Sequence, residues 1–237
     1  MALSEDKNFK KFYKTSPDGQ LHYQDAIKAR EGLTKEEIAK TFDAWVDKGK
    51  YESDTSRLGY VGPQVTAETV SKLYDDVQRE RIKILDVAAG TGLLSRELRK
   101  YGFKNIDGVD PSEKSKELAM KDGLYDRYVV DFVDEHDLDI QSESYDCVAS
   151  TGGFAAGLMP CSAIKEFIRV AKIGGMICFS VPDYIYTACE EYRDRFEPRL
   201  VQYEDSGLWK RRSKTPVKSY LDNAPGTIYV FTKIKSL

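Results

Sequence analysis

IKILDVAAGTGLL, residues 82–94, is an apolar run that ends in Asp86 and is followed by a turn of small residues and the start of a helix. Glycine has no Cβ, so Gly90 and Gly92 let the backbone pass close beneath a ligand and adopt positive φ angles. The segment therefore predicts a strand, a tight turn and a helix over which a flat or extended ligand lies.

The position of Asp86 separates two ligand classes that use such a unit. A dinucleotide fold has the spacing GxGxxG and places a pyrophosphate on the helix N-terminus. Here Ser95 occupies the place of the third glycine, and a carboxylate beside the turn would repel a diphosphate and attract a cation. S-adenosylmethionine, which carries an ammonium, a sulfonium and a carboxylate, suits this loop, and a nucleotide-dependent oxidoreductase is disfavoured.

A second acid follows the next predicted strand. Residues 105–109 lead into Asp110, which lies 24 residues beyond Asp86, and Pro111 and Ser112 follow at a helix start. A carboxylate at the end of a second strand can accept both hydroxyls of a ribose. A helix cap or a solvated turn is the alternative role for Asp110, and its spacing from the first motif favours ribose binding.

The chain resembles the class I S-adenosylmethionine-dependent methyltransferases, whose first motif is an acid followed by glycines at every second position. Asp86, Ala88, Gly90 and Gly92 match this motif, with alanine in place of the first glycine. Other stretches resemble the Williams-Beuren syndrome chromosomal region 27 protein (methyltransferase-like) family: FDAWVDKGKYESDTSRLGYVGP (42–63), GVDPS (108–112), GLYDRYVVDF (123–132), YDCVASTGGF (145–154) and MPCSAIKEFIRVAKIGGMICFSV (159–181). The resemblance covers residues 38–234.

This resemblance implies a set of cofactor-binding residues. The first motif would hold the methionine part of S-adenosylmethionine, and Asp110 would hold the ribose. Asp134 and Glu135, in the loop after the third strand, would flank the adenine, with Asp131 as the alternative if that strand ends earlier.

Residues 150–153 would offer backbone near the sulfonium, Thr151 and Gly152 among them. Tyr51 and Tyr60 come from an upstream segment that folds over the cofactor in related enzymes. A tyrosine ring near the sulfonium would gain cation–π attraction, although ordinary packing in a helix or loop is an equally good account of both rings.

Alternating signals along the chain predict an α/β fold. We expect strands near 82–87, 105–109, 127–133, 145–150 and 175–181, interleaved with helices near 92–101, 112–121 and 161–172. A tyrosine-rich helix to about residue 200 and strands at 208–220 and 226–234 would follow. The predicted architecture is the Rossmann-like class I methyltransferase fold, a seven-stranded, mostly parallel, doubly wound sheet with a C-terminal antiparallel hairpin and an N-terminal helical lid.

Two amphipathic helices are expected upstream of the first strand. Thr34 and Glu37 have the spacing of a capping box, and the apolar face of the helix that follows holds Ile38, Phe42, Trp45 and Val46. After the punctuation at residues 58–63, a second helix would present Val70, Leu73, Tyr74 and Val77 on its apolar face.

Length and charge limit the function classes. The 237 residues suit one methyltransferase domain over 33–237, with residues 1–32 as an N-terminal extension or lid. The 36 basic and 39 acidic residues give a net charge of −3, so no global field favours nucleic acid or an anionic membrane. The charged N-terminus and the shortness of every apolar run predict a cytoplasmic protein.

The four cysteines and two histidines do not predict a metal site. No CxxC pair occurs, and Cys147 and Cys178 fall in predicted buried strands, where reduced cysteine behaves as a small apolar side chain.

Missing motifs point to a small-molecule methyl acceptor. Residues 150–160 contain neither the PP-aromatic element that grips a flipped base nor the glutamates that arginine methylation requires, and the basic run at 210–218 would be split over two faces of a strand. Tyr184, Tyr186 and Tyr192 would help to enclose a flat or cationic acceptor.

The catalytic residues are not predicted. Methyl transfer is an in-line displacement that needs alignment more than a strong base, and His136, Asp183 or a tyrosine would serve only a hydroxyl acceptor. Because no base is evident, a non-catalytic S-adenosylmethionine-binding regulatory protein of the same fold is the alternative. We expect a monomer or a homodimer.

Overall fold

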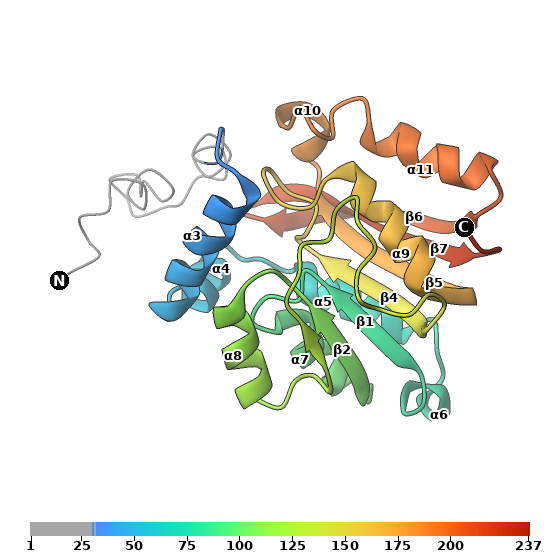
Figure 1. Ribbon diagram of the computed structural model, residues 1–237, viewed down its shortest axis with the longest axis horizontal. Coiled ribbons are helices and arrows are strands. Elements are labelled where there is room, and N and C mark those ends of the chain that lie inside the picture. The colour runs from blue at the N-terminus through green and yellow to red at the C-terminus, as the bar shows by residue number, and fades with distance from the viewer. Residues whose placement is uncertain (1–29, 31) are drawn as a thin grey trace.

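The strand before the glycine-containing turn lies in the middle of a seven-stranded sheet. The computed structural model describes Arg30 and residues 32–237, and the strand order is β3-β2-β1-β4-β5-β7-β6 (Figure 1). The strands are β1 (Lys83–Val87), β2 (Asn105–Val109), β3 (Tyr128–Val129), β4 (Tyr145–Thr151), β5 (Ala171–Pro182), β6 (Trp209–Leu221) and β7 (Ala224–Lys233). The first five run parallel, and β7 pairs antiparallel with both β5 and β6. The predicted parallel sheet with a C-terminal antiparallel hairpin is confirmed.

Helices cover both faces of this sheet (Figure 1). They are α3 (Lys35–Asp47), α4 (Tyr51–Arg57), α5 (Gly62–Ser71), α6 (Asp76–Arg79), α7 (Leu93–Lys100), α8 (Glu113–Lys121), α9 (Ile164–Val170), α10 (Ile185–Ala188) and α11 (Phe196–Asp205), with a 3₁₀ turn at Cys161–Ala163. Helices α5, α7 and α8 lie on one face, and α9 and α11 lie on the other. Thr34 and Glu37 form the predicted capping box at the start of α3.

Alternation along the strands divides the apolar side chains between two cores. Ile84 and Cys147 belong to the core beneath α5 and α7, whereas Leu85 and Val148 face the core beneath α9 and α11. Successive strand residues point to opposite faces, so a sheet covered on both sides needs apolar residues at nearly every position. Cys147 and Cys178 are buried in β4 and β5, as their positions predict.

The helices upstream of β1 differ from the expected pattern. α5 begins at Gly62, inside the predicted punctuation, and ends at Ser71. Asp75 then caps the separate short helix α6, so the chain turns before it reaches Val77. The side chain of Val77 is 65% exposed, and its expected place on a buried apolar face is wrong.

Three further boundaries differ from expectation. β3 has two residues, Tyr128 and Val129, which pair with β2; beyond them the N–H of Phe132 donates to the Asp131 side chain instead of to a neighbouring strand. The helix expected over 161–172 ends at Val170, where β5 begins. The expected tyrosine-rich helix is broken into α10 and α11, and in the segment between them the Tyr192 hydroxyl donates to the carbonyl oxygens of Ala155 and Met159 at 2.9 and 2.5 Å.

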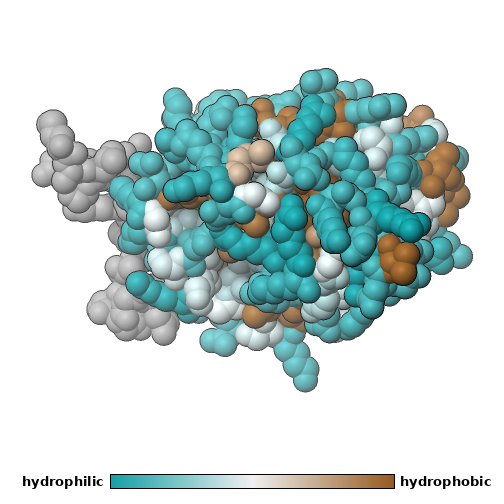
Figure 2. Space-filling model, turned by 90° about the horizontal axis from the view of Figure 1, so that it is seen from below, coloured by the Kyte–Doolittle hydropathy of each residue, from teal (hydrophilic) through white to brown (hydrophobic). Residues whose placement is uncertain are grey.

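The face of the molecule drawn in Figure 2 has no broad apolar area. Figure 2 shows the molecule from below, and hydrophobic side chains there form separate patches within a largely hydrophilic surface. In the described part of the chain, no helix combines the length and apolar character needed to span a bilayer.

Phe154→Ala tests the larger core. Phe154 is 1% exposed, and its ring lies 5.1 to 5.6 Å from the rings of Phe196, Phe179 and Phe167. We expect the free energy of unfolding in urea to fall by about 3–5 kcal/mol, because the variant leaves a cavity. Val77→Ala, on an exposed side chain, should change it by less than about 0.5 kcal/mol. Equal effects of the two substitutions would contradict this account of the core.

Candidate functional site

The loop after β1 crosses the ends of two strands. Gly90 and Gly92 have φ angles of 51° and 89°, and Ala88 has a φ of 58°. An alanine in this left-handed region costs about 1–2 kcal/mol, which shows why glycine is the usual residue at that position. The N–H of Gly90 donates to Oδ2 of Asp110 at 3.1 Å, so the loop is fixed to the end of β2.

Asp86 lies beneath this loop with one carboxylate oxygen unpaired. The side chain is 1% exposed, and Oδ2 accepts a hydrogen bond from the Tyr125 hydroxyl at 2.7 Å. Oδ1 is buried and has no hydrogen-bond partner among the described residues. Burial raises the pKa of Asp86 to about 7, the Tyr125 hydroxyl opposes this rise and nearby Asp110 adds to it. A cationic group near Asp86 would therefore stabilise the ionised form.

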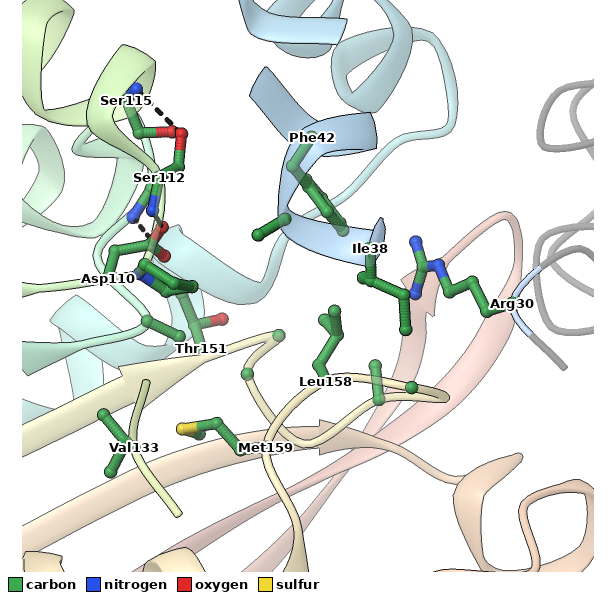
Figure 3. A pocket seen from close by; sticks show the side chains of 18 of the residues that line it. Arg30, Ile38, Phe42, Asp110, Ser112, Ser115, Val133, Thr151, Leu158 and Met159 are labelled. Carbon is green, nitrogen blue, oxygen red and sulfur yellow. Dashed lines mark hydrogen bonds between the residues drawn. The ribbon is translucent and has the colours of Figure 1, made fainter. Parts of the chain in front are cut away.

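Asp110 projects into the cavity above the loop (Figure 3). Its Oδ1 accepts the N–H of Ser112 at 2.9 Å, while Oδ2 accepts the N–H of Gly90. Burial raises the pKa of Asp110 to about 6, although both backbone bonds lower it. A carboxylate has about four lone-pair positions, so two remain for hydroxyl groups of a ligand.

The cavity lies between the loop, the end of β4 and the helices α3 and α4. Its volume is about 260 Å³. Its aromatic lining consists of Phe42, Trp45, Tyr51, Tyr60, Phe132, Tyr184 and Tyr220. Such walls favour ligands with flat or apolar parts and a few well-placed polar groups.

Three polar contacts fasten α3 and α4 over the cavity. Lys35 on α3 forms a 2.6 Å ion pair with Asp134. The Ser112 hydroxyl donates to Asp43 of α3 at 2.5 Å, and Arg96 of α7 reaches Glu52 of α4 at 2.7 Å. The two helices thus form a roof that is tied to the sheet domain at several points.

The structure brings most of the predicted site residues together. Those that line the cavity are Tyr51, Tyr60, Ala88, Gly90, Asp110, Asp134, Thr151 and Gly152. Asp86 lies below the loop and Gly92 begins α7 as its N-cap. Glu135 is exposed and lies outside the cavity lining.

The three candidate bases also have definite positions. His136 lies outside the cavity lining and contacts Asp134 and Asp131 at 2.6 and 3.1 Å. Asp183 accepts a hydrogen bond from the Thr227 hydroxyl at 2.7 Å and is likewise not part of the lining. Of the candidate bases, the tyrosines are the ones found in the described cavity lining, at Tyr51, Tyr60, Tyr184 and Tyr220.

A cluster of five hydroxyl groups at the ends of β4, β5 and β6 was not predicted. Thr151 contacts Tyr60, Ser180 and Tyr220 at 2.8, 2.9 and 3.2 Å. Ser180 also contacts Tyr220 at 2.9 Å and accepts a bond from Thr66 at 2.8 Å. Burial raises the pKa of Tyr60 and of Tyr220, so these hydroxyls stay protonated. Strand periodicity does not identify the cluster, because its members come from four distant segments.

Unpaired polar atoms test whether the site fits a cationic adenosyl donor. Asp86 Oδ1, Thr91 Oγ1 and Ser150 Oγ are buried, and each lacks a hydrogen-bond partner among the described residues. Buried polar atoms are usually paired, but Asp86, Thr91 and Ser150 lie outside the cavity lining, so they are not part of the surface that a ligand in the cavity contacts. Asp110 does line the cavity, and its two free lone-pair positions fit the ribose of S-adenosylmethionine. Within residues 30 and 32–237, no three His, Cys, Asp or Glu side chains gather in a way that could hold a metal ion.

Sequence comparison shows similarity to methyltransferases of several kinds. Residues 85–179 match the family model described as a methyltransferase domain. Human methyltransferase-like protein 27 is 31% identical over 176 residues, which are 74% of this chain and 69% of that protein. The demethylmenaquinone methyltransferase of Thermotoga maritima is 31% identical over 150 residues, 62% of each protein. Human EEF1A lysine methyltransferase 2 is 26% identical over 189 residues, 72% of this chain and 68% of that protein.

Comparison with solved structures supports the same fold. An S-adenosylmethionine-dependent methyltransferase from Clostridium acetobutylicum matches with a TM-score of 0.57. The match covers 80% of this chain and 99% of that one at 13% sequence identity. At this identity, the likeness concerns the arrangement of helices and strands.

Asp86→Asn tests the buried carboxylate. Folding raises the pKa of Asp86 from its ordinary value of 3.8 to about 7, so between these values the folded protein holds a proton that the unfolded chain releases. The contribution of Asp86 to stability therefore falls as the pH rises through this window. We expect the unfolding temperature of the variant, relative to wild type, to increase from pH 4 to pH 8. Asp139→Asn, on an exposed side chain, should parallel the wild type, and parallel curves for Asp86→Asn would contradict the assignment.

Proposed function

Because the chain belongs to the methyltransferase family that includes human methyltransferase-like protein 27, we propose that it transfers the methyl group of S-adenosylmethionine to a small-molecule acceptor. The observation that supports the acceptor class is the aromatic lining of the cavity beneath α3 and α4. The aromatic lining would bury a flat acceptor.

The residues around the glycine-containing loop would hold the donor. Asp86 and the loop that carries Ala88, Gly90 and Gly92 would hold the methionine part, since the carboxylate attracts an ammonium and the small residues allow close approach. Asp110 would accept the ribose hydroxyls with its free lone pairs.

The adenine and sulfonium ends would rest on the cavity walls. Asp134 lies in the cavity lining beside Phe132, where a flat ring could stack. Tyr51 and Tyr60 on the opposite wall would face the sulfonium, with Thr151 and Gly152 beneath it. Tyrosine rings attract such a cation through their π faces.

Catalysis would consist mainly of alignment. When bound, S-adenosylmethionine supplies a methyl group carried on a positively charged sulfur. The helices α3 and α4 would exclude water, and the walls would hold the acceptor in line with that methyl group, so that proximity and orientation lower the barrier to displacement.

The hydroxyl cluster would orient the acceptor by accepting a hydrogen bond. Its five hydroxyls, on Tyr60, Thr66, Thr151, Ser180 and Tyr220, form five hydrogen bonds with one another. Each hydroxyl has one proton, so the five bonds use all five protons. Because the bond of Tyr60 in this set is the one to Thr151, Tyr60 is the donor in that bond. The Tyr60 oxygen then accepts no bond inside the cluster and is left for an N–H or O–H of the acceptor.

The nucleophile would arrive without its proton or lose it to water. The carboxylates of the described lining are Asp110 and Asp134; Asp110 accepts two backbone N–H groups and Asp134 pairs with Lys35. An amine or a thiolate needs no further base, so these acceptor atoms fit the site better than an aliphatic hydroxyl.

The basic run on β6 gives little support to a nucleic-acid partner. Arg211 and Lys214 both pair with Glu197 of α11, at 3.4 and 2.6 Å. Glu197 offsets one of these two positive charges, which weakens the contribution of the pair to binding of a phosphate backbone. We further propose that residues 33–237 act as one methyltransferase domain, as a monomer or a homodimer.

A non-catalytic binding protein is the second candidate function. It is favoured by the positions of His136 and Asp183 outside the cavity lining, which leave no independent base there among the described residues. Donor binding without transfer to any acceptor would distinguish this function from the first.

Asp110→Ala tests the ribose assignment. We expect the dissociation constant of S-adenosylhomocysteine, measured by calorimetry, to rise by about 100-fold or more, because two hydrogen bonds to a charged group are lost. Asp205→Ala, on the exposed side of α11, is the matched control and should bind as the wild type does. Unchanged affinity in a folded Asp110→Ala protein would remove Asp110 from the donor site.

Transfer of a labelled methyl group tests the acceptor class. The wild-type protein is incubated with methyl-labelled S-adenosylmethionine and a cell extract that has been separated into metabolite, protein and RNA fractions. We expect label in the metabolite fraction, since the aromatic lining of the cavity suits a small, flat acceptor. Label in protein or RNA would refute the small-molecule proposal, and tight donor binding with no labelled product in any fraction would favour the regulatory alternative.

A further inference from the structure

Arg30 lies at the end of the cavity opposite Asp110. Figure 3 shows its side chain directed toward Ile38, with Leu158 between it and Thr151. The guanidinium is part of the cavity lining, and it lies over the ring of Phe42 at 5.1 Å. Arg30 therefore places a positive charge beside the apolar side chains of Ile38, Phe42 and Leu158.

Among the described residues, the Arg30 guanidinium has one hydrogen-bond acceptor. One terminal nitrogen donates to the carbonyl oxygen of Ala156 at 3.0 Å. Nε is buried and has no partner among the described residues. A guanidinium has five N–H donors in a planar fork that matches a carboxylate. Arg30 can therefore donate to both oxygens of a carboxylate and keep its bond to Ala156.

The other charges of the lining do not neutralise Arg30. Lys35 and Asp134 form an ion pair with each other. Asp110 is held by backbone N–H groups on the far side of the cavity. No described residue gives Arg30 a carboxylate partner within 4.0 Å. Its contacts among the described residues, the Ala156 carbonyl and the Phe42 ring, hold the guanidinium without neutralising its charge.

We propose that Arg30 binds a carboxylate of the methyl acceptor, so that the substrate is a flat, mostly apolar acid. This inference rests on the proposed function, because it requires the donor to occupy the Asp110 end. Tyr184, which follows β5, and the loop at 155–159 would complete the acceptor end. The acceptor's uncharged end would then point toward Thr151 and Tyr60.

The charge of Arg30 also revises the expected acceptor. The aromatic lining fits the flat molecule predicted from the sequence, but a cationic acceptor would meet the guanidinium at this end of the cavity. An acid is therefore favoured over an amine of the same shape.

Binding of small aromatic acids tests the proposal. The probes are benzoate, 4-hydroxybenzoate and indole-3-acetate, each compared with its neutral amide, and the protein is saturated with S-adenosylhomocysteine. Ligand-observed NMR titrations are carried out on the wild type, Arg30→Met, Arg30→Lys and Arg193→Met. Arg193 is exposed and lies outside the cavity lining, so it is a matched control.

We expect at least one acid to bind the wild type and Arg193→Met about tenfold or more tightly than its amide, as a charged hydrogen-bonded pair predicts. Arg30→Met should abolish this preference, and Arg30→Lys should restore part of it because the charge returns without the fork. Affinity for S-adenosylhomocysteine should be the same in all four proteins, which also shows that each is folded.

Other results would overturn the proposal in distinguishable ways. If S-adenosylhomocysteine fails to bind even the wild type, the proposed function fails. If it binds but acids show no preference over amides, or keep that preference in Arg30→Met, the role of Arg30 is wrong and the proposed function stands. If Arg30→Met weakens S-adenosylhomocysteine but not adenosine, Arg30 holds the carboxylate of the donor instead.

Discussion

The hydrogen bond from the N–H of Gly90 to the carboxylate of Asp110 fixes the geometry on which the site depends. It ties the loop after β1 to the end of β2, so that Asp86 is buried under the loop while Asp110 faces the cavity. Burying carboxylates costs free energy unless positive charge or hydrogen bonds compensate, and the raised pKa values of both acids reflect that cost. A ligand that brings an ammonium and a diol supplies what these two side chains lack.

The parts of the fold set by local pattern could be predicted from the sequence. The loop between β1 and α7, the parallel strands and the closing hairpin follow from glycine positions, short apolar runs and their spacing. The comparisons confirm the methyltransferase family and fold. The capping box of α3 was predictable because Thr34 and Glu37 interact within one turn. Asp110 could be placed in the site because the carboxyl ends of neighbouring parallel strands lie side by side.

Features that depend on contacts between distant segments could not be predicted. The break between α10 and α11 is held by Tyr192, which bonds to carbonyl groups more than 30 residues earlier in the chain. Tyr220 joins Thr151 only because β7 pairs with β5 and carries β6 on its other side. Val77 fits a helical apolar pattern, yet the capping of α6 by Asp75 ends that pattern first. Periodicity measures local preference; tertiary contacts override it at Tyr192 and Tyr220, and a local helix cap overrides it at Val77.

The two ends of the cavity carry opposite charges. Asp110 lies at one end and Arg30 lies at the other, separated by apolar side chains. An anionic acceptor placed at the Asp110 end would be repelled by that carboxylate, and a cationic donor placed at the other end would meet the guanidinium. Each reactant therefore has one favourable end, provided that it carries the complementary charge. With the two outer ends fixed in this way, the reacting atoms meet in the middle of the cavity, where Tyr60 and Thr151 present their hydroxyl groups.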